Sequence, residues 1–416
     1  MNIAYLIWLE NLSQPIIKGQ VFEVMKRIRK ISSLDNFYFI VFQDKSNFLL
    51  KRKDFRNIRK ELMDENIHLI LIPSFQFAND MFIPKWYIIP LIFLQSFLIL
   101  LIITFADKID ILHCRGYPIT LTAIAVKKIK RNIKVIFDPR SPFPEEMIST
   151  GRWAYDSLSY KAWKYLEKKC LRGADITIAI ADSYVKHFKK IYSNTKFEII
   201  PNNTDVTKFI IDNESRNYFR KFLGIKDSEL IFVYSGSLGN HWNNPKIYAK
   251  FIIKLRELDI KHRFLFVIEK TDELKKVFDH YNIESNEYFV FSVNFNDMPQ
   301  YLSMADFGLN LMEKQDIRMS IKTVEYLAMG LPIITNSNVL GACEVVKQHN
   351  IGYIIDDIEN INMKKLKNFL GEKDQISSRC RKLACEKFST EEVAKQYISV
   401  YKIKDKANND FNCLCL

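Results

Sequence analysis

The stretch IRMSIKTVEYLAMGLPIITNS, residues 317–337, decides which fold the chain is expected to have. It joins a loop that carries Arg318 to a helical pattern over 321–329, and an apolar strand pattern follows directly. The first turn of a helix presents backbone N–H groups and a partial positive charge, which suits a phosphate. Lys322 and Arg318 would add cationic groups there, and Glu325 would accept hydrogen bonds from vicinal hydroxyls. An amphipathic surface helix with exposed charges explains the same pattern.

The same succession of strand, loop and helix runs through the whole chain. Strands are predicted first at 2–9, 38–42, 68–72, 110–113, 134–138 and 176–180, and then at 230–234, 264–268, 289–292, 307–312, 332–335 and 353–355. Helical patterns separate them, for example at 19–32, 119–130, 155–171, 245–258 and 321–329. Apolar strands that alternate with helices predict parallel sheets covered on both faces. The fold class is therefore α/β, with two doubly wound domains and ligands beyond the carboxyl ends of the strands.

Two domains also follow from the length, because 416 residues exceed one ordinary core. The turn-rich segment EIIPNNTDVTKF marks the predicted boundary. The expected domains cover residues 1–205 and residues 206–388. Residues 389–416 would form a last helix, packed back toward the first domain, and a frayed tail. That helix opens with Ser389 and Glu392, a capping box pattern.

The net charge of +13 is uneven. Residues 1–205 hold 31 Lys and Arg against 20 Asp and Glu, so most of the excess lies there. Basic clusters attract polyanions or an anionic membrane surface, although solvated helix faces explain them equally well. No RNA-binding or zinc-finger spacing accompanies them, so nucleic acid is not an expected partner. Seven cysteines without metal or disulfide spacing, and no signal peptide, favour a cytoplasmic location.

The segment WYIIPLIFLQSFLILLIITFA, residues 86–106, contains no charged residue. Its length reaches that of a membrane span. A buried core helix, a helix in the membrane interface and a true span are the three interpretations. We reject the span because it would place the two halves of one predicted sheet on opposite sides of the bilayer.

A loop of the first domain also carries polar groups at the carboxyl end of a predicted strand. In IFDPRSPFPEEM, Asp138, Arg140, Glu145 and Glu146 follow the strand within a few residues. Such carboxylates would contact an acceptor hydroxyl or orient Arg140. An Asp138–Arg140 interaction within a turn, with exposed glutamates, explains the pattern equally well.

SIKTVEYLAMGLPIITN resembles the donor-site signature of glycosyltransferase family 4, the retaining sugar-nucleotide enzymes with the GT-B fold. Four further segments resemble parts of that family in the same order: DILHCRGYP, EIIPNNTDVTKF, VYSGSLGNHW and NDMPQYLSMADFGL. The segments span nearly the whole chain. The resemblance therefore implies two Rossmann-like domains that face each other across a cleft, an acceptor-binding domain over 1–205 and a nucleotide-sugar-binding domain over 206–388.

The resemblance also implies roles for single residues. Glu325 matches the glutamate that holds the donor ribose, and Ser320, Ile321 and Lys322 match the loop around the donor phosphates and sugar. The other positions that match donor-binding residues are Gly19 in the first domain, Gly236 and Ser237 around the diphosphate, and Val293 at the nucleobase. Arg318 is a further donor-site cation. The expected catalytic residues are Arg115, Asp138, Arg140 and Lys322, and the expected acceptor residues are Glu145 and Glu146.

The chain departs from the family pattern at three of these positions. Isoleucine occupies position 317, where the family has a glutamate that interacts with the transferred sugar. Ser237 stands in place of an arginine, so the positive charge at the diphosphate is expected from Lys322 and Arg318. Arg115 stands in place of a cleft histidine. The departures leave the identity of the donor sugar open.

The expected function is retaining transfer of a hexosyl or N-acetylhexosaminyl group (EC 2.4) from a nucleotide-diphosphate sugar. The acceptor would be polyprenol-linked or a glycan, in capsule, O-antigen, lipopolysaccharide or other bacterial surface polysaccharide synthesis. No cofactor or metal is expected. The basic first domain and the segment 86–106 fit peripheral association with the anionic inner face of the cell membrane. The alternatives are a GT-B sugar-nucleotide epimerase and a non-catalytic, membrane-bound scaffold that binds nucleotide.

Overall fold

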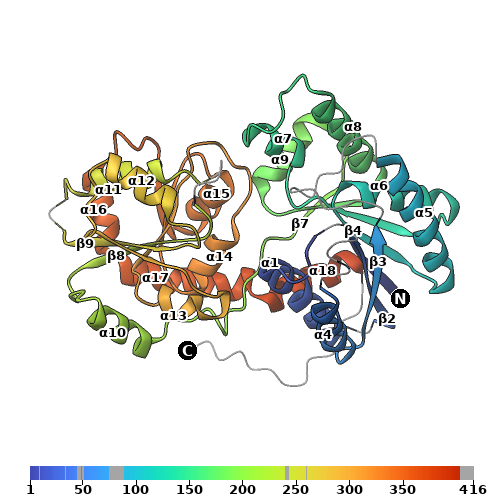
Figure 1. The fold of residues 1–416 in the computed structure, drawn as a ribbon, viewed down its shortest axis with the longest axis horizontal. Coiled ribbons are helices and arrows are strands. Elements are labelled where there is room, and N and C mark those ends of the chain that lie inside the picture. The colour runs from blue at the N-terminus through green and yellow to red at the C-terminus, as the bar shows by residue number, and fades with distance from the viewer. Residues whose placement is uncertain are drawn as a thin grey trace. The chain divides into compact units, whose positions relative to one another are not determined.

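The computed structural model describes residues 1–8, 10–32, 34–44, 48, 51–74, 89–238, 243–258 and 260–402. The chain forms two compact units (Figure 1). Unit 1 contains Met1–Ile180, Val185–Ile200 and the residues from Val393 onward. Unit 2 contains Ala181–Tyr184 and Pro201–Glu392.

Unit 1 is built on a seven-stranded sheet in the order β3-β2-β1-β4-β5-β6-β7, and all neighbouring strands are parallel. The strands are β1 (Asn2–Trp8), β2 (Asn36–Asp44), β3 (Ile67–Ser74), β4 (Ile111–Arg115), β5 (Lys134–Asp138), β6 (Ile176–Ala179) and β7 (Phe197–Ile199). The helical elements of the first 200 residues are α1 (Pro15–Ile17), η1 (Lys18–Phe22), α2 (Glu23–Ile31), α4 (Arg52–Met63), α5 (Ile89–Ala106), α6 (Tyr117–Ile129), α7 (Phe143–Ser149), α8 (Leu158–Gly173) and α9 (Asp182–Ile191).

Strand β1 shows why helices cover both faces of this sheet. Successive side chains of a strand point to opposite faces. Tyr5 and Ile7 belong to one buried apolar cluster, whereas Ala4 and Leu6 belong to another. A strand that is apolar on both faces must be covered on both, as predicted from the uninterrupted apolar runs.

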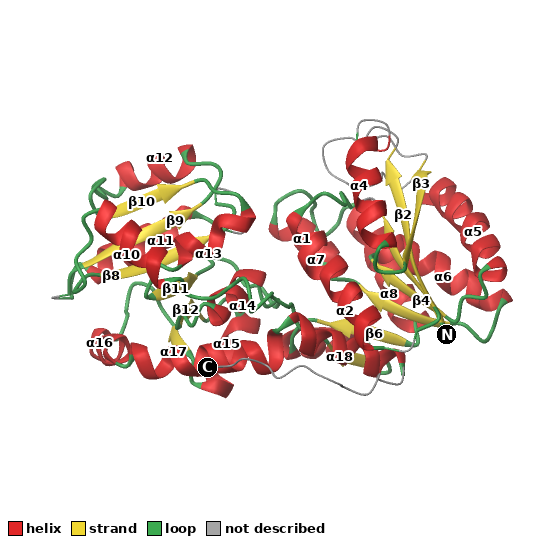
Figure 2. Cartoon of the chain, turned by 90° about the horizontal axis from the view of Figure 1, so that it is seen from below, coloured by secondary structure: helices red, strands yellow, loops and turns green. Residues whose placement is uncertain are grey.

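Unit 2 repeats the plan with a six-stranded parallel sheet in the order β10-β9-β8-β11-β12-β13 (Figure 2). The strands are β8 (Leu230–Ser235), β9 (His262–Val267), β10 (Tyr288–Phe291), β11 (Phe307–Asn310), β12 (Ile333–Asn336) and β13 (Gly352–Ile355). The helical elements are α10 (Asn213–Phe222), α11 (Pro245–Leu255), α12 (Asp272–His280), η3 (Phe295–Asp297), α13 (Met298–Leu302), α14 (Ile321–Ala328), α15 (Leu340–His349), α16 (Met363–Gly371), α17 (Lys373–Leu383) and η4 (Ala384–Phe388).

Helix α14 lies very close to the sheet of unit 2. A Cβ at Gly308 on β11 would lie 2.4 Å from the Tyr326 ring of α14, so only glycine fits. The Tyr326 hydroxyl in turn accepts a hydrogen bond from the backbone N–H of Ser235 at 2.7 Å. Gly308 and Tyr326 therefore fix the position of α14 against β8 and β11.

The prediction of two doubly wound parallel sheets is confirmed. The twelve predicted strands all form, with ends shifted by two residues at most. Strand β7 was not among those predicted, and it is only three residues long with half-exposed and exposed side chains. A strand this short and this polar lacks the apolar run on which the prediction depended.

The apolar segment 86–106 forms helix α5 from Ile89, and residues 86–88 lie outside the described part of the chain. One face is buried, for example at Ile92 and Leu100, and Ser96 Oγ hydrogen-bonds Thr122 Oγ1 of α6 at 2.9 Å. The opposite face is apolar yet exposed, at Leu91, Leu94, Leu98, Ile102 and Phe105. No described helix has both the length and the apolar character that crossing a membrane requires. Helix α5 thus covers the core on one side only.

The last described helix is α18 (Thr390–Tyr401). Ser389 accepts a hydrogen bond from the Glu392 N–H at 3.2 Å, as the predicted capping pattern requires. The helix begins among residues of unit 2 and belongs to unit 1 from Val393. Tyr397 and Tyr401 are buried in the same apolar cluster as Tyr5.

Candidate functional site

Two loops meet at the carboxyl edge of the sheet of unit 2. Strands β8 and β11 are parallel neighbours, so the chain leaving β8 at Gly236 and the chain leaving β11 toward α14 lie at the same edge. Gly236 has a φ of 126°, which residues with a side chain rarely adopt. A Cβ at Gly236 would lie 3.5 Å from Nζ of Lys322. The structure thus brings Gly236 and Lys322 together, as the sequence predicts.

Lys322 lies in the first turn of α14 with its ammonium group over an aromatic ring. Its Nζ donates to the Tyr234 hydroxyl at 3.0 Å and lies 4.1 Å from the centre of that ring. Burial lowers the pKa of Lys322 to about 7, although the charges of Glu325 and Asp316 oppose the change. An anionic group beside this nitrogen would restore its proton. The position is therefore suited to a phosphate.

Ser320 precedes α14 without capping it. Its hydroxyl instead pairs with Thr323 Oγ1 at 3.0 Å and accepts from Asn310 Nδ2 at 3.0 Å. Because no side chain caps the helix, the N–H groups of its first residues, beginning with Ile321, are left for solvent or a ligand. Asn310, at the end of β11, fixes the direction in which the loop enters α14.

Glu325 lies one turn further into α14. Its side chain is only 7% exposed, and burial raises the pKa of its carboxyl group to about 7, against the opposing charge of Lys322. No residue in the described part of the chain donates a hydrogen bond to this carboxylate. The carboxylate is therefore left to solvent or to a ligand that supplies donors. Ribose hydroxyls are donors of the required type.

Arg318 is paired with a carboxylate of its own loop. Its guanidinium group donates to Asp316 from Nε to Oδ1 and from Nη2 to Oδ2, both at 2.9 Å, and from Nε to Oδ2 at 3.2 Å. The prediction of Arg318 as a cation for the diphosphate did not include this carboxylate partner. A bidentate pair neutralises most of the charge that Arg318 would offer, which leaves Lys322 as the cation best suited to an anion here.

The backbone around Ile317 is fixed from two sides. The Ile317 carbonyl accepts from Ser183 Oγ at 2.7 Å. A Cβ at Gly341 would lie 2.6 Å from the backbone of Arg318 and Met319, so only glycine permits this approach. The loop is therefore held in place, while the Ile317 side chain brings neither charge nor a hydrogen-bonding group to it.

Two further donor-site predictions, Ser237 and Val293, also lie at this edge. Ser237 is exposed, and its carbonyl accepts from the Tyr234 hydroxyl at 2.7 Å. Val293 follows β10, two strands from β8, and is half-buried. Their predicted contacts with the diphosphate and the base stay predictions.

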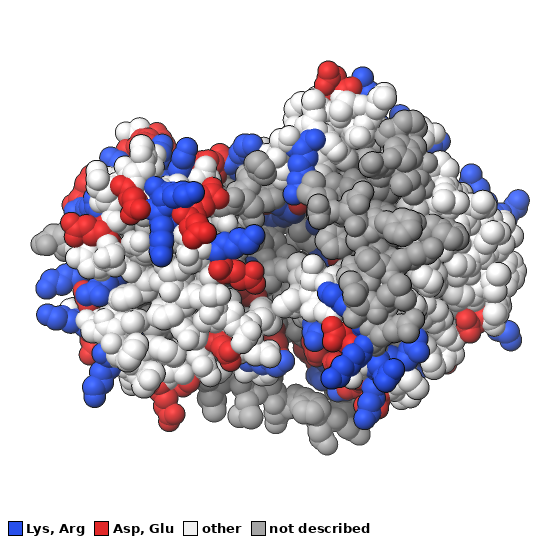
Figure 3. Space-filling view, viewed as in Figure 1, with Lys and Arg blue, Asp and Glu red and all other residues white. Residues whose placement is uncertain are grey.

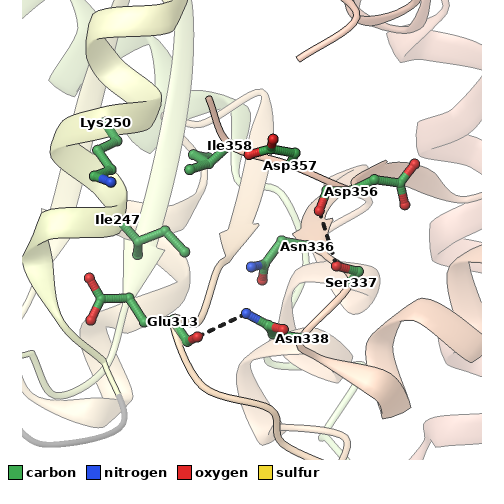
Figure 4. A pocket seen from close by; sticks show the side chains of 9 residues that line it. All are labelled: Ile247, Lys250, Glu313, Asn336, Ser337, Asn338, Asp356, Asp357 and Ile358. Atoms are coloured by element: carbon green, nitrogen blue, oxygen red, sulfur yellow. Dashed lines mark hydrogen bonds between the residues drawn. The ribbon is translucent and has the colours of Figure 1, made fainter. Parts of the chain in front are cut away.

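A second feature of this edge is a polar pocket, which Figure 4 shows from close by. Its lining residues come from α11 and from the loops after β11, β12 and β13: Ile247, Lys250, Glu313, Asn336, Ser337, Asn338, Asp356, Asp357 and Ile358. Much of its polar lining is already paired, since Asn338 Nδ2 donates to the Glu313 carbonyl at 2.9 Å and Lys250 pairs with Glu359. None of the predicted donor residues lines this pocket.

In unit 1, Arg115 and Asp138 end the parallel neighbours β4 and β5 and lie directly opposite each other in register. Arg115 Nε donates to Glu10 Oε1 at 2.7 Å, and Arg140 Nη1 lies 3.6 Å from Asp138 Oδ2. Burial alone would raise the pKa of Asp138, but Arg140, His113 and Arg115 hold it at about 2. The structure therefore brings the three predicted residues together around one ionised carboxylate.

Asp138 is fully buried, and both of its carboxylate oxygens lack a hydrogen-bond partner in the described structure. This carboxylate acts on its neighbours, and a substrate does not reach it without rearrangement. Arg140 has a φ of 58°, uncommon for a residue with a side chain. The interaction with Asp138 compensates for this conformation.

The two predicted acceptor residues lie on α7. Glu145 pairs with Lys164 at 2.8 Å, and Lys164 also contacts the fully buried Glu167. Glu146 accepts from Ser141 Oγ at 2.6 Å. Both carboxylates therefore have partners inside unit 1, and a contact with an acceptor stays a prediction.

Gly19 lies in η1, which continues directly from α1. A Cβ at this position would meet no atom of the described residues within 4 Å. The described part of the chain contains no group of His, Cys, Asp or Glu side chains arranged to hold a metal ion.

Sequence analysis missed two polar partners at these sites. Tyr234 holds Lys322, and its signal was a polar aromatic residue at the carboxyl end of a strand, just before Gly236. Glu10 holds Arg115, and its signal was a lone carboxylate just after β1. Each partner lies far along the chain from the residue that it binds.

Two family models match the chain, "Glycosyltransferase Family 4" over residues 59–208 and "Glycosyl transferases group 1" over residues 215–384. A relative from Methanocaldococcus jannaschii, described as an uncharacterized glycosyltransferase, is 22% identical over 317 residues. The match covers 71% of this chain and 76% of the relative.

Solved structures resemble the chain over almost its full length. A glycosyltransferase from Rickettsia africae has a TM-score of 0.70 at 16% identity, with 96% of this chain and 97% of that chain covered. Anabaena Alr3699/HepE, solved in complex with UDP, has a TM-score of 0.69 at 14% identity, with coverage of 97% and 100%. At these identities the likeness shows a shared fold, and the predicted GT-B fold is confirmed.

Proposed function

The chain is a glycosyltransferase of family 4, and we propose that it transfers a hexosyl or N-acetylhexosaminyl group from a nucleoside-diphosphate sugar to a lipid-linked or glycan acceptor. Configuration at the transferred carbon is retained, as the family resemblance implies. The acceptor belongs to the synthesis of a bacterial surface polysaccharide such as capsule or lipopolysaccharide.

The observation that carries this proposal is the pairing of Lys322 and Glu325 at the start of α14. Burial draws the pKa of both groups to about 7, so each lacks the ligand or solvent that would favour its charged form. A nucleoside diphosphate supplies both needs: its phosphates lie against Lys322 and Gly236, and its ribose hydroxyls donate to Glu325. The Anabaena structure that shares the fold contains UDP, which makes UDP the first nucleotide to test.

In the transfer step, the bond between the anomeric carbon and the diphosphate oxygen breaks. The acceptor hydroxyl oxygen forms a new bond to that carbon from the same face, and its proton passes to the departing diphosphate. Negative charge develops on the diphosphate, where the Lys322 ammonium and the first N–H groups of α14 stabilise it. No metal ion is needed in this scheme.

Unit 1 has charged groups of its own at the carboxyl edge of its sheet. Arg115 and Arg140 offer cationic groups at the carboxyl ends of β4 and β5, and Asp138 positions them. Gly19 stays a predicted contact of the donor phosphates. Glu145 and Glu146 contact the acceptor in this proposal, which requires them to exchange their present partners for it.

The exposed face of α5 supports a lipid-linked acceptor at the cytoplasmic face of the cell membrane. Leu91, Leu94, Leu98, Ile102 and Phe105 form one exposed apolar stripe along the helix. Figure 3 shows the surface over α5 as a largely uncharged area with both Lys or Arg and Asp or Glu side chains at its margin. An apolar helix face of this kind suits the interface of a bilayer.

The donor site is tested with UDP and UDP-glucose in thermal-shift and calorimetric titrations of the full-length protein. Lys322→Ala and Glu325→Ala are expected to weaken binding at least tenfold and to reduce transfer about a hundredfold. Lys276→Ala, which removes an exposed lysine on α12 of the same unit, is the matched control and should leave both unchanged. Full binding and activity in both site variants would refute the placement.

Membrane association is tested by flotation with vesicles of phosphatidylglycerol and phosphatidylcholine at low salt. The double variant Leu94→Ser with Leu98→Ser is expected to lose most of the bound fraction. Leu158→Ser, at an exposed leucine of α8, is the control and should float like the unaltered protein. If the unaltered protein does not float at all, α5 does not dock on the membrane.

Two other functions remain distinguishable by experiment. An epimerase of the same fold would form product from the donor alone, without an acceptor. A scaffold that only binds nucleotide, which Ile317 and Ser237 favour because they lack the family's charged groups, would bind tightly and show no turnover with any donor and acceptor.

A further inference from the structure

A buried chain of polar side chains runs behind the cationic groups of unit 1. The Tyr401 hydroxyl of α18 lies 2.6 Å from Nδ1 of His113 on β4. Nε2 of the same ring lies 3.7 Å from Asp138 Oδ2. Asp138 is then 3.6 Å from Nη1 of Arg140. The side chains of His113 and Asp138 are fully buried, so this chain is closed to solvent at its centre.

The positions of Tyr401 and Asp138 on either side of His113 favour one tautomer of its imidazole ring. Burial lowers the pKa of His113, and a neutral ring carries one N–H and one acceptor nitrogen. If the Tyr401 hydroxyl donates to Nδ1, the proton lies on Nε2 and faces the Asp138 carboxylate. The opposite tautomer would place a lone pair of Nε2 against that carboxylate, which is repulsive. Tyr401 is therefore the donor that orients His113.

His113 Nε2 and both oxygens of Asp138 have no hydrogen-bond partner in the described structure, although all three are buried. A small movement of either side chain would thus bring the Nε2–H group of His113 within hydrogen-bonding distance of the Asp138 carboxylate. Active-site hydrogen bonds are often long without a ligand and shorten when it binds. A shift of Asp138 toward His113 would also move the carboxylate that holds Arg140.

We propose that the Tyr401 hydroxyl is a positioning group for the transfer site, which acts through His113 to orient Asp138 and, through Asp138, the cations Arg140 and Arg115. The inference rests on the proposed function, because it gives these cations their part in the transfer. It adds a residue of the last helix, far from the motifs of the sequence, to the machinery. The hydroxyl matters here, whereas a merely structural role would need only the ring.

Helix α18 offers a matched control. The Tyr397 ring also packs against His113, with ring centres 5.6 Å apart, but the hydrogen bond to His113 comes from Tyr401. Tyr401→Phe and Tyr397→Phe each remove one hydroxyl from a buried ring of the same helix. Only Tyr401→Phe should disturb the imidazole.

The first test is nitrogen NMR of full-length protein labelled with 15N-histidine, with the His113 signal assigned by its loss in His113→Gln. The expected spectrum shows the Nε2-protonated tautomer in the unaltered protein and in Tyr397→Phe, and a mixture of tautomers or a shifted signal in Tyr401→Phe. An unchanged His113 signal in Tyr401→Phe would overturn the inference. This readout needs no turnover, so it stands even if the proposed function fails.

The second test is release of UDP from UDP-glucose in the presence of a bacterial membrane extract as the source of acceptor. Tyr401→Phe should lower kcat about tenfold, with KM for the donor unchanged. In the His113→Gln background, adding Tyr401→Phe should have no further effect on kcat, because Tyr401 acts through His113. Multiplying effects in the double variant, or an equal loss in Tyr397→Phe, would overturn the inference. If the unaltered protein releases no UDP, the proposed function fails for this donor, and the tautomer measurement alone decides the role of Tyr401.

Discussion

At the carboxyl edges of the two sheets, the surroundings shift the pKa values of charged residues in opposite senses, toward the neutral forms in unit 2 and toward the charged forms in unit 1. In unit 2, burial draws the pKa of Lys322 down and that of Glu325 up, both to about 7. In unit 1, Asp138 is held at a pKa of about 2, and the pKa of Arg115 stays above its usual range because nearby acidic groups outweigh its burial. At the edge of unit 2 burial therefore outweighs the nearby opposite charges, and at the edge of unit 1 the nearby opposite charges outweigh burial.

This difference indicates at which carboxyl edge the residues need a ligand to become fully charged. Buried charges without good partners favour their neutral forms until a partner arrives, as Lys322 and Glu325 do. Buried charges with oppositely charged partners are ionised without a ligand and stay so over a wide pH range, as Asp138 does. We therefore expect substitutions in unit 1 to affect folding first, and substitutions in unit 2 to affect ligand binding first.

Asp138→Asn removes the ionised carboxylate that the cations of unit 1 surround. We expect it to have the largest effect on stability. Removing one member of a buried ionic cluster leaves its partners uncompensated, so the free energy of unfolding should fall by roughly 3–5 kcal/mol in urea denaturation. Because the folded-state pKa is lowered, this contribution is present above pH 4 and is lost as the pH falls through about 2.

Asp374→Asn is the matched control for that change. Asp374 is 96% exposed, so the control should stay within about 0.5 kcal/mol of the unaltered protein. An Asp138→Asn variant as stable as this control would show that the cluster of unit 1 contributes nothing to folding.

Gly308→Ala should destabilise the packing of α14 against the sheet of unit 2 without changing any charge. The added methyl group would meet the Tyr326 ring at 2.4 Å, and forced overpacking costs roughly 1–3 kcal/mol. Because the ring belongs to α14, the change should also weaken UDP binding. Gly371→Ala adds a methyl group with no atom within 4 Å and should leave both stability and binding unchanged.

Tyr234→Phe should have the smallest effect of the three. It keeps the ring over which Lys322 lies and removes the hydroxyl, which accepts from Lys322 and donates to the Ser237 carbonyl. The loss of each such bond is worth about 1 kcal/mol, so the calorimetric affinity for UDP should fall roughly fivefold to thirtyfold. A change of a hundredfold would mean that Tyr234 contacts the nucleotide itself.

The sequence predicted the fold well because uninterrupted apolar strands alternate with helices in both halves. It also predicted which residues reach each carboxyl edge, since Gly236 directly follows its strand, Asp138 ends its strand, and Lys322 opens the helix that the loop after β11 enters. It did not reveal that Arg318 binds Asp316, that Lys322 lies over Tyr234 or that Tyr401 reaches His113. These pairings depend on side-chain directions and on packing between distant segments, which the spacing of residues does not encode.

The central claim is that a nucleoside-diphosphate sugar binds at Lys322 and restores its proton. The most direct measurement is calorimetry of UDP-glucose binding at pH 7 in buffers of different ionisation enthalpy, with Lys322→Arg as the comparison. With a pKa of about 7, Lys322 should take up about half a proton per bound ligand, while Glu325, whose pKa is also about 7, should release a similar amount as its charged form is favoured. Lys322→Arg is charged throughout and keeps only the release from Glu325, so the unaltered protein should bind about half a proton more per ligand than this variant. Equal proton exchange in the two proteins would contradict the account.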